Sequence, residues 1–210
     1  MKFYIGVTDN KWWNFLKSNN PDEVNFWKPG AKSFRAITPG APFLFKLHSP
    51  YNYIVGGGFF VSYSILSLSL AWECFGVKNG AESLGVVRKL IQNRKRTSEH
   101  NPIIGCTILT EPFFFEREEW LPVPTDWAPN IVSGKTYDTE ETTGAQLWSA
   151  VQERLLTKKQ NLVETLVQPE VADPSAPYGE WHPVLAKARI GQGTFRVHVT
   201  DAYHRRCSMT

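Results

Sequence analysis

The sequence has few of the patterns that mark an enzyme or a metal-binding protein. It contains three cysteines, Cys74, Cys106 and Cys207, and their odd number and wide spacing fit neither a disulfide framework nor a zinc site. The glycines at 56–58 lack the spacing of a dinucleotide fingerprint, and the residues around Lys135 are not a phosphate loop. Metal-ligand spacing and a serine elbow are also absent. We therefore expect no catalytic residue, no metal and no cofactor in this chain.

Long apolar runs and a secretory leader are missing as well. A membrane-spanning helix needs roughly 18 to 20 apolar residues. The longest apolar stretch, Ile54 to Phe75, is interrupted by three glycines, four serines and a glutamate. Met1 is followed by a strand-like KFYIGV and not by a basic and then apolar leader. We expect a cytoplasmic protein with no membrane partner.

What the sequence does contain is the composition of a folded domain. Of its 210 residues, 42% are hydrophobic and 13% aromatic, enough for a sizeable core in one domain plus a fragment. The net charge is only +3, but basic residues gather at 88–96 and at 187–206. Such clusters can neutralise the phosphates of a nucleic acid. A solvated helix face is the other interpretation of either cluster, and composition alone does not decide between the two.

Alternation and capping residues predict the order of the elements. Residues 2–7 alternate as a strand, and Thr8-Asp9 can cap a helix that carries Trp12 and Trp13. The glycines at 56–58 predict a bend in the strand that contains them. We expect strands at 43–47, 53–63, 102–110 and 195–199, turns at 19–22 and 25–30, a loop at 127–137, and helices at 67–75, 81–97 and 144–156.

Two stretches resemble known families. The segment FRAITPGAPFLFKLHSPYNYIVGGGFFV is similar to the PUA superfold, which includes the EVE, ASCH, YTH and SRA modified-base readers. With SLAWECFG and GKTYD it resembles the N-terminal region of bacterial HNH endonucleases of the modification-dependent restriction type. The resemblance, which covers about 25–148, implies an α+β fold: a PUA-like twisted β-barrel with flanking helices.

The last twenty residues, GQGTFRVHVTDAYHRRCSMT, resemble the entry to the nuclease domain of the same HNH enzymes. We therefore expect a PUA-like reader at 1–160, a Pro-rich linker at 161–186 and a truncated start of the HNH domain at 187–210. The metal-binding and general-base histidines of that family would lie downstream, so the chain itself should not cut DNA. The other interpretation is a C-terminal strand and tail of an intact domain.

The resemblance implies that the chain recognises a modified base, such as 5-methylcytosine or 5-hydroxymethylcytosine, in double-stranded DNA. Readers of this superfold commonly flip the base into an aromatic pocket. An RNA-binding or nucleotide-ligand-binding PUA-like sensor is the alternative, since the same pocket chemistry would serve it. The full-length protein is also a candidate for a homodimer. Flipping a base costs a few kcal/mol, which aromatic stacking and hydrogen bonds to the base edge must return.

Residue types suggest which side chains would do this. Trp27, placed in the turn at 25–30, is the preferred stacking platform, although it would serve equally to close the end of the barrel. Hydrogen-bonding groups and a second aromatic wall would complete the base pocket, and each of them also has an ordinary interpretation as core, turn or solvated surface. The candidate base-pocket residues are Trp12, Asn25, Trp27, His48, Asn52, Trp72 and Glu73, and the candidate DNA-backbone contacts are Lys28, Arg35, Lys46, Arg88, Arg94, Lys95, Arg96 and Lys135.

Overall fold

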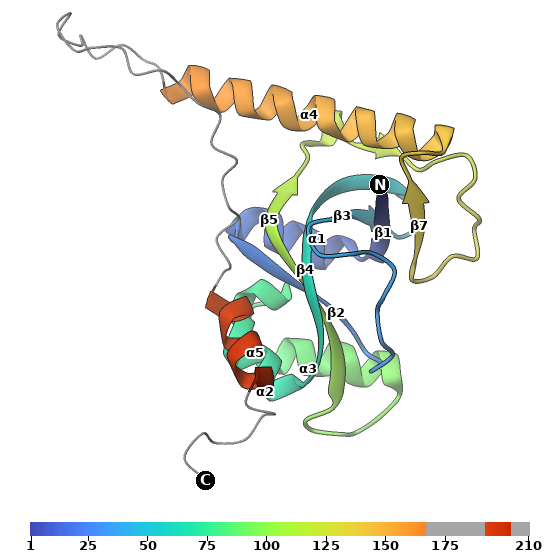
Figure 1. Cartoon of the computed structure of the whole chain (residues 1–210). Helices are drawn as coiled ribbons and strands as arrows, with labels where there is room; N and C mark the ends of the chain where they lie inside the picture. Colours follow the sequence, from blue (N-terminus) through green and yellow to red (C-terminus); the bar gives the residue numbers. More distant parts are fainter. Residues whose placement is uncertain (167–191, 203–210) are drawn as a thin grey trace, which may run out of the picture.

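The structure of this chain, a computed structural model, describes the backbone of residues 1–166 and 192–202 and the side chains of 1–158 and 192–199. Within these residues, seven strands form one mixed sheet that helices flank (Figure 1). The strands are β1 Lys2–Thr8, β2 Glu23–Lys28, β3 Pro42–Leu47, β4 Tyr53–Ser67, β5 Ile103–Phe114, β6 Leu121–Pro122 and β7 Gly134–Asp138. The helices are α1 Asn10–Asn19, α2 Leu68–Phe75, η1 Gly76–Asn79, α3 Leu84–Lys95, η2 Arg117–Glu119, α4 Thr142–Leu166 and α5 Gln192–Ala202.

The sheet runs in the order β2-β5-β4-β3-β1-β7, and β6 pairs with β4 outside this path. Only β1 and β3 are parallel, and the remaining pairs are antiparallel. The sheet is curled. A Cβ built on Gly6 in β1 would lie 3.0 Å from the ring of Phe26 in β2, although β1 and β2 are four positions apart in the strand order. The predicted α+β class is confirmed.

The predicted bend in β4 is confirmed too. The pairing of β4 with β5 shifts register between Gly57 and Phe59 and again between Phe60 and Ser62. A Cβ at Gly57 would lie 2.6 Å from the carbonyl oxygen of Phe43 and 2.7 Å from the ring of Phe113. Glycine is required there because the backbones of neighbouring strands approach too closely for a side chain. These bulges let the long strand β4 bend across the molecule (Figure 1).

Three apolar clusters fill the fold. The first lies inside the curl of the sheet, where Phe26, Phe43 and Phe45 pack with Trp12 and Leu16 of α1. The second lies under α2, α3 and α5, and the third lies between the other face of β1 and β3 and the first turns of α4. Figure 1 accordingly shows α4 across one end of the sheet and α2, α3 and α5 gathered at the other. None of the described helices has both the length and the apolar character that a membrane crossing needs.

The helix starts follow the sequence closely. The carboxylate of Asp9 accepts the backbone N–H of Trp12 at 2.8 Å and caps α1. Ser67 caps α2 through the N–H of Leu70, and α2 ends at Phe75 with Gly76 as its C-cap, as predicted. Side chains that accept orphan N–H groups are the usual N-terminal signal of a helix.

The predicted turn at 25–30 is wrong, because Asn25 to Lys28 belong to strand β2. Both faces of β2 are covered. Val24 and Phe26 face the first cluster, while Trp27 belongs to the second, and Asn25 is also fully buried. Asn25 and Pro29-Gly30 are typical of a turn, but here the side chain of Asn79, far away in the sequence, bonds the buried amide of Asn25 inside a strand.

The predicted strand at 195–199 is also wrong, since residues 192–202 form helix α5. Thr194 and Val197 are buried, three residues apart, while Phe195 and Val199 face outward. The helical period therefore decides which residues pack, although the apolar residues alternate in the sequence. The predicted Pro-rich linker and the basic C-terminal cluster lie largely outside the described residues. The domain boundary at residue 160 stays a prediction, and helix α4 continues past it to Leu166.

Candidate nucleic-acid interface

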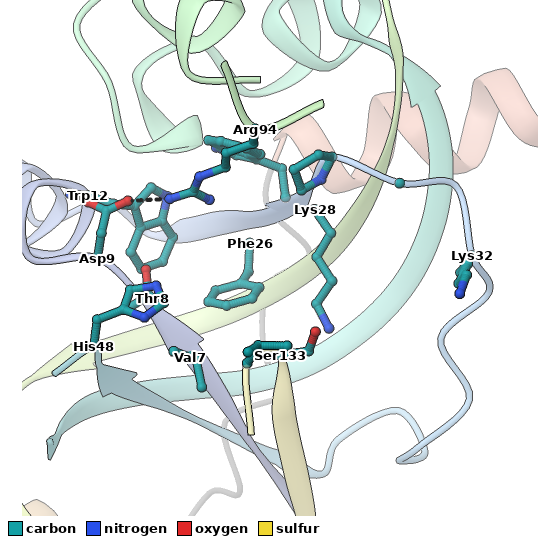
Figure 2. A pocket seen from close by; sticks show the side chains of 14 residues that line it. Val7, Thr8, Asp9, Trp12, Phe26, Lys28, Lys32, His48, Arg94 and Ser133 are labelled. Atoms are coloured by element: carbon teal, nitrogen blue, oxygen red, sulfur yellow. Dashed lines mark hydrogen bonds and ion pairs between the residues drawn. The ribbon is translucent and has the colours of Figure 1, made fainter. Parts of the chain in front are cut away.

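A pocket of about 460 Å³ opens where the end of β1 faces the end of β2 (Figure 2). Its volume lies within the roughly 300–1,000 Å³ of small-molecule sites. The curl of the sheet makes this pocket, because β1 and β2 meet there without pairing to each other. The lining residues are Val7, Thr8, Asp9, Trp12, Phe26, Trp27, Lys28, Pro29, Gly30, Lys32, His48, Arg94, Val132 and Ser133.

Three aromatic side chains, Trp12, Phe26 and Trp27, belong to the apolar part of the wall. Phe26 lies in the middle of the pocket in Figure 2, and its ring meets that of Trp12 edge to face at a centroid distance of 5.4 Å. The indole N–H groups of Trp12 and Trp27 both donate to the backbone carbonyl oxygen of Asn79, at 3.1 and 2.9 Å. Because only 6% of Trp12 and 7% of Trp27 are exposed, these rings are fixed walls and offer edges to a ligand.

Asn79 is the hub that holds these walls. It is the last residue of η1 and is 1% exposed. Its side-chain oxygen accepts from the amide of Asn25 at 2.8 Å, and its own amide donates to the carbonyls of Ala71 and Gly76 at 3.2 and 2.8 Å. One asparagine thus connects α2, η1, β2 and α1 behind the pocket.

Lys28 supplies the least compensated charge of the pocket. Its ammonium lies 5.3 Å from the ring centre of Tyr4 and 5.4 Å from that of Phe34, two cation–π contacts. Burial lowers the pKa of Lys28, and no carboxylate in the described part of the chain forms an ion pair with it. An ammonium removed from water without a counter-ion is a site for an anionic ligand.

Arg94 and Lys32 add positive charge at the rim. The guanidinium of Arg94 pairs with Asp9 at 2.9 Å and lies 5.3 Å from the ring centre of Trp27. Lys32 stands on the segment after β2, where the hydroxyl of Tyr63 donates to its backbone carbonyl at 2.6 Å. Of the rim cations, Arg94 is therefore held in place by two contacts.

His48 lies beside Thr8 and completes the polar side of the pocket (Figure 2). Burial, and then the positive charge of Arg94, lower the pKa of His48 below its ordinary value of 6.5. The imidazole is therefore neutral at pH 7 and offers one donor and one acceptor. Thr8 and Ser133 are the other side chains with hydroxyl groups at the pocket.

The structure brings some of the predicted site residues together and separates others. Five of the fifteen line this pocket: Trp12, Trp27, Lys28, His48 and Arg94. Asn25 lies behind it, fully buried, with its amide on Asn79.

Two predicted residues lie on another part of the sheet. The ammonium of Lys46 donates to the side-chain oxygen of Asn52 at 2.8 Å and stands over the ring of Trp127. Burial lowers the pKa of Lys46 as well. Because alternate residues of a strand face opposite sides, Lys46 points away from the face that carries Phe45 and the pocket.

The remaining predicted residues lie outside the pocket. Trp72 and Glu73 belong to α2, next to α5, where the backbone carbonyl of Glu73 accepts from Arg196. The basic side chains at 35 and in α3 and β7 do not line the pocket, with the exception of Arg94. Arg88 donates to the carbonyl of His100, Lys95 pairs with Glu99 and Lys135 with Asp126, while Arg35 and Arg96 are exposed.

Sequence reasoning missed several residues of the site. Thr8 and Asp9 were assigned only to helix capping, although Asp9 both caps α1 and holds Arg94. The apolar alternation of Val24 and Phe26 was a signal for the strand that carries Phe26. Ser133 and Asn79 left no local signal, since their roles depend on segments far away in the sequence.

No protein-family model matches this sequence, and a search of curated proteins also found no match. Among solved structures, the chain is similar to ASCH from Zymomonas mobilis, at 11% identity and a TM-score of 0.44 over 68% of this chain and 92% of that one. Two single mutants of the same protein give 9% and 6% identity, TM-scores of 0.47 and 0.45, and coverage of 71% of this chain and of 98% and 95% of theirs. At these values the likeness concerns the path of the backbone alone.

Proposed function

We propose that this chain is a nucleic-acid-binding module that takes a single nucleotide into the pocket between β1 and β2. The observation that carries this proposal is Lys28, a half-buried ammonium without a carboxylate partner among the described residues, beside an aromatic wall. A phosphate fits such a charge, and a base fits the aromatic wall. A nucleotide is the ligand that has both groups.

The dimensions and the polar groups support the same ligand. The pocket, at about 460 Å³, is large enough to enclose a drug-sized molecule, and a nucleotide is of that size. Contact with Phe26 and with the edges of Trp12 would contribute toward the few kcal/mol that flipping a base costs. Thr8, His48 and Ser133 can donate to and accept from the edge of the base.

The finer assignment is a modified cytosine in duplex DNA. It rests on the sequence resemblance to the N-terminal region of modification-dependent HNH endonucleases. In this proposal the chain binds and has no catalytic residue of its own, and double-stranded DNA is its partner. RNA and free nucleotides share the chemistry of the ligand, so the experiment has to distinguish them.

The test measures binding of the whole chain by fluorescence anisotropy at two salt concentrations. The probes are matched duplexes with cytosine, 5-methylcytosine, 5-hydroxymethylcytosine or glucosylated cytosine, a single-stranded RNA and a free nucleotide. We expect one modified duplex to bind at least tenfold more tightly than the unmodified one. Equal affinity for all duplexes would reject the modified-base assignment, and preference for RNA or free nucleotide would favour the alternative sensor function.

Lys28→Met tests the pocket itself, and Lys135→Met is the matched control because Lys135 pairs with Asp126 away from the pocket. A hydrogen bond to a charged group contributes about 1.5–3 kcal/mol, so Lys28→Met should weaken binding roughly 10- to 100-fold. Trp27→Ala is less suitable, because this buried ring also supports the fold. If the two lysine variants bind equally well, the ligand does not occupy this pocket.

A further inference from the structure

Helix α5 is docked on the body of the protein by a buried carboxylate. Glu23, the first residue of β2, has no exposed surface. Its two oxygens accept the backbone N–H of Gly193 at 2.8 Å, the N–H of Thr194 at 3.1 Å and the hydroxyl of Thr194 at 2.6 Å. A carboxylate at the start of a helix satisfies N–H groups that have no partner within the helix.

The rest of α5 fits the same surface. Val197 is buried against the apolar cluster of α2, and Arg196 donates to the backbone carbonyl of Glu73 at 3.0 Å. A Cβ at Gly193 would lie 2.7 Å from both the carbonyl oxygen of Cys74 and the Glu23 carboxylate. The surface therefore fits a helix whose second and third residues are glycine and threonine.

A continuous set of contacts runs from this carboxylate to the walls of the pocket. Lys78 in η1 donates to Glu23 at 3.0 Å and pairs with Asp22 at 2.6 Å. Burial tends to lower the pKa of Lys78, but the bonds to Asp22 and Glu23 outweigh it and raise that pKa. The next residue is Asn79, whose carbonyl holds both Trp12 and Trp27.

Strand β2 gives a second connection between the same two places. Its first residue, Glu23, holds α5, and its last residue, Lys28, lines the pocket. The strand spans only six residues, so α5 and the pocket contact the two ends of one short element. Strand β2 thus carries both Glu23, which holds α5, and Lys28, which lines the pocket. Helix η1 bonds the same Glu23 through Lys78 and holds the indoles of the pocket through Asn79.

We propose that docking of α5 and occupation of the pocket are coupled, so that the protein with α5 docked binds its nucleotide more tightly. This regulation rests on the proposed function of the pocket. When α5 is released, Glu23 loses three donors and keeps only Lys78, so its carboxylate, and with it Lys78 and η1, is held less firmly in position. The indoles are then held less firmly. By linkage, a ligand that requires fixed indoles favours the docked helix to the same extent.

Two variants of the whole chain should release α5, and neither of them substitutes a residue that lines the pocket. The double variant Gly193→Ala and Thr194→Val adds the clashing Cβ and removes the hydroxyl donor, and Val197→Asp places a charge in the apolar contact. Gln192→Ala, at an exposed position of the same helix, is the control. Hydrogen exchange of the α5 amides reports docking. If neither variant accelerates exchange, these contacts do not hold α5 and the proposal is wrong.

Two further measurements test the coupling. The NMR signals of the Trp12 and Trp27 indole N–H groups, assigned with Trp→Phe variants, should shift in both releasing variants and not in the control. Affinity for the best duplex should fall about fivefold or more, and saturating duplex should slow α5 exchange in the unaltered protein by the same factor. Faster α5 exchange with unchanged indole signals would overturn the coupling. If no nucleic acid binds, the proposed function fails, and the indole signals still decide whether α5 and the pocket are connected.

Discussion

Asn79→Ala is expected to be among the most destabilising single substitutions in this protein. The side chain is buried and forms three hydrogen bonds, with Asn25, Ala71 and Gly76. Removal of one partner from a buried bond costs about 1–3 kcal/mol, and the bond to Gly76 is partly accessible to water. Two buried bonds and one accessible bond give a loss of about 3–5 kcal/mol in the free energy of unfolding. Few small domains tolerate such a loss easily, since their total stability is about 5–15 kcal/mol.

Urea unfolding, followed by far-UV circular dichroism, measures this loss as a lower midpoint with an unchanged m-value. Asn25→Ala is the comparison, because Asn25 bonds Asn79 and Cys106 through its amide while its side-chain oxygen is buried and has no partner among the described residues. It should therefore cost less, about 1–2 kcal/mol. If Asn79→Ala costs under about 1 kcal/mol, or no more than Asn25→Ala, then Asn79 is not the hub that the structure indicates.

Three other predictions concern the pocket and the sheet. Because His48 is neutral at pH 7 and gains a proton below its lowered pKa, affinity for an anionic ligand should rise as the pH falls below 6.5, and His48→Gln should flatten this titration of binding. Lys32→Ala should reduce the slope of log affinity against log salt concentration by about one unit if Lys32 contacts a phosphate, whereas an unchanged slope would remove it from the interface. Gly57→Ala should destabilise the protein by about 1–3 kcal/mol, because its Cβ would meet the backbone of β3. The midpoint of thermal unfolding should therefore fall, and an unchanged midpoint would disprove the close approach.

The sequence predicted those parts of the fold that depend on near neighbours. Alternation in 43–47, the caps at Asp9 and Ser67 and the bend at 56–58 are local signals, and all appear in the structure. β2 and α5 could not be predicted in this way. Asn25 is acceptable inside a strand only because Asn79 bonds it, and the start of α5 depends on Glu23, 170 residues away.

The same limit applies to the candidate site. Residue type was enough to select Trp12, His48 and Arg94 as binding groups, and the pocket contains them. It was not enough to separate them from Lys46, Glu73 and Lys135, whose side chains can also bind parts of a nucleotide. The strand face decides for Lys46, and position on the surface decides for the other two. Such distinctions require the curl of the sheet, which depends on pairing between distant segments.

The different depths of the three pocket cations have a consequence for the kinetics of binding. Arg94 is exposed and held by Asp9 and Trp27, and Lys32 is exposed on the segment after β2. Charges at a rim accelerate encounter with a polyanion, and salt screens them over about 10 Å at 0.1 M. Lys28 is shielded between Tyr4 and Phe34, so its contact with a phosphate would form late and break late. For the proposed nucleic-acid ligand, the association rate would thus be set at the rim and would depend on ionic strength, whereas the lifetime of the complex would be set by Lys28 beneath it.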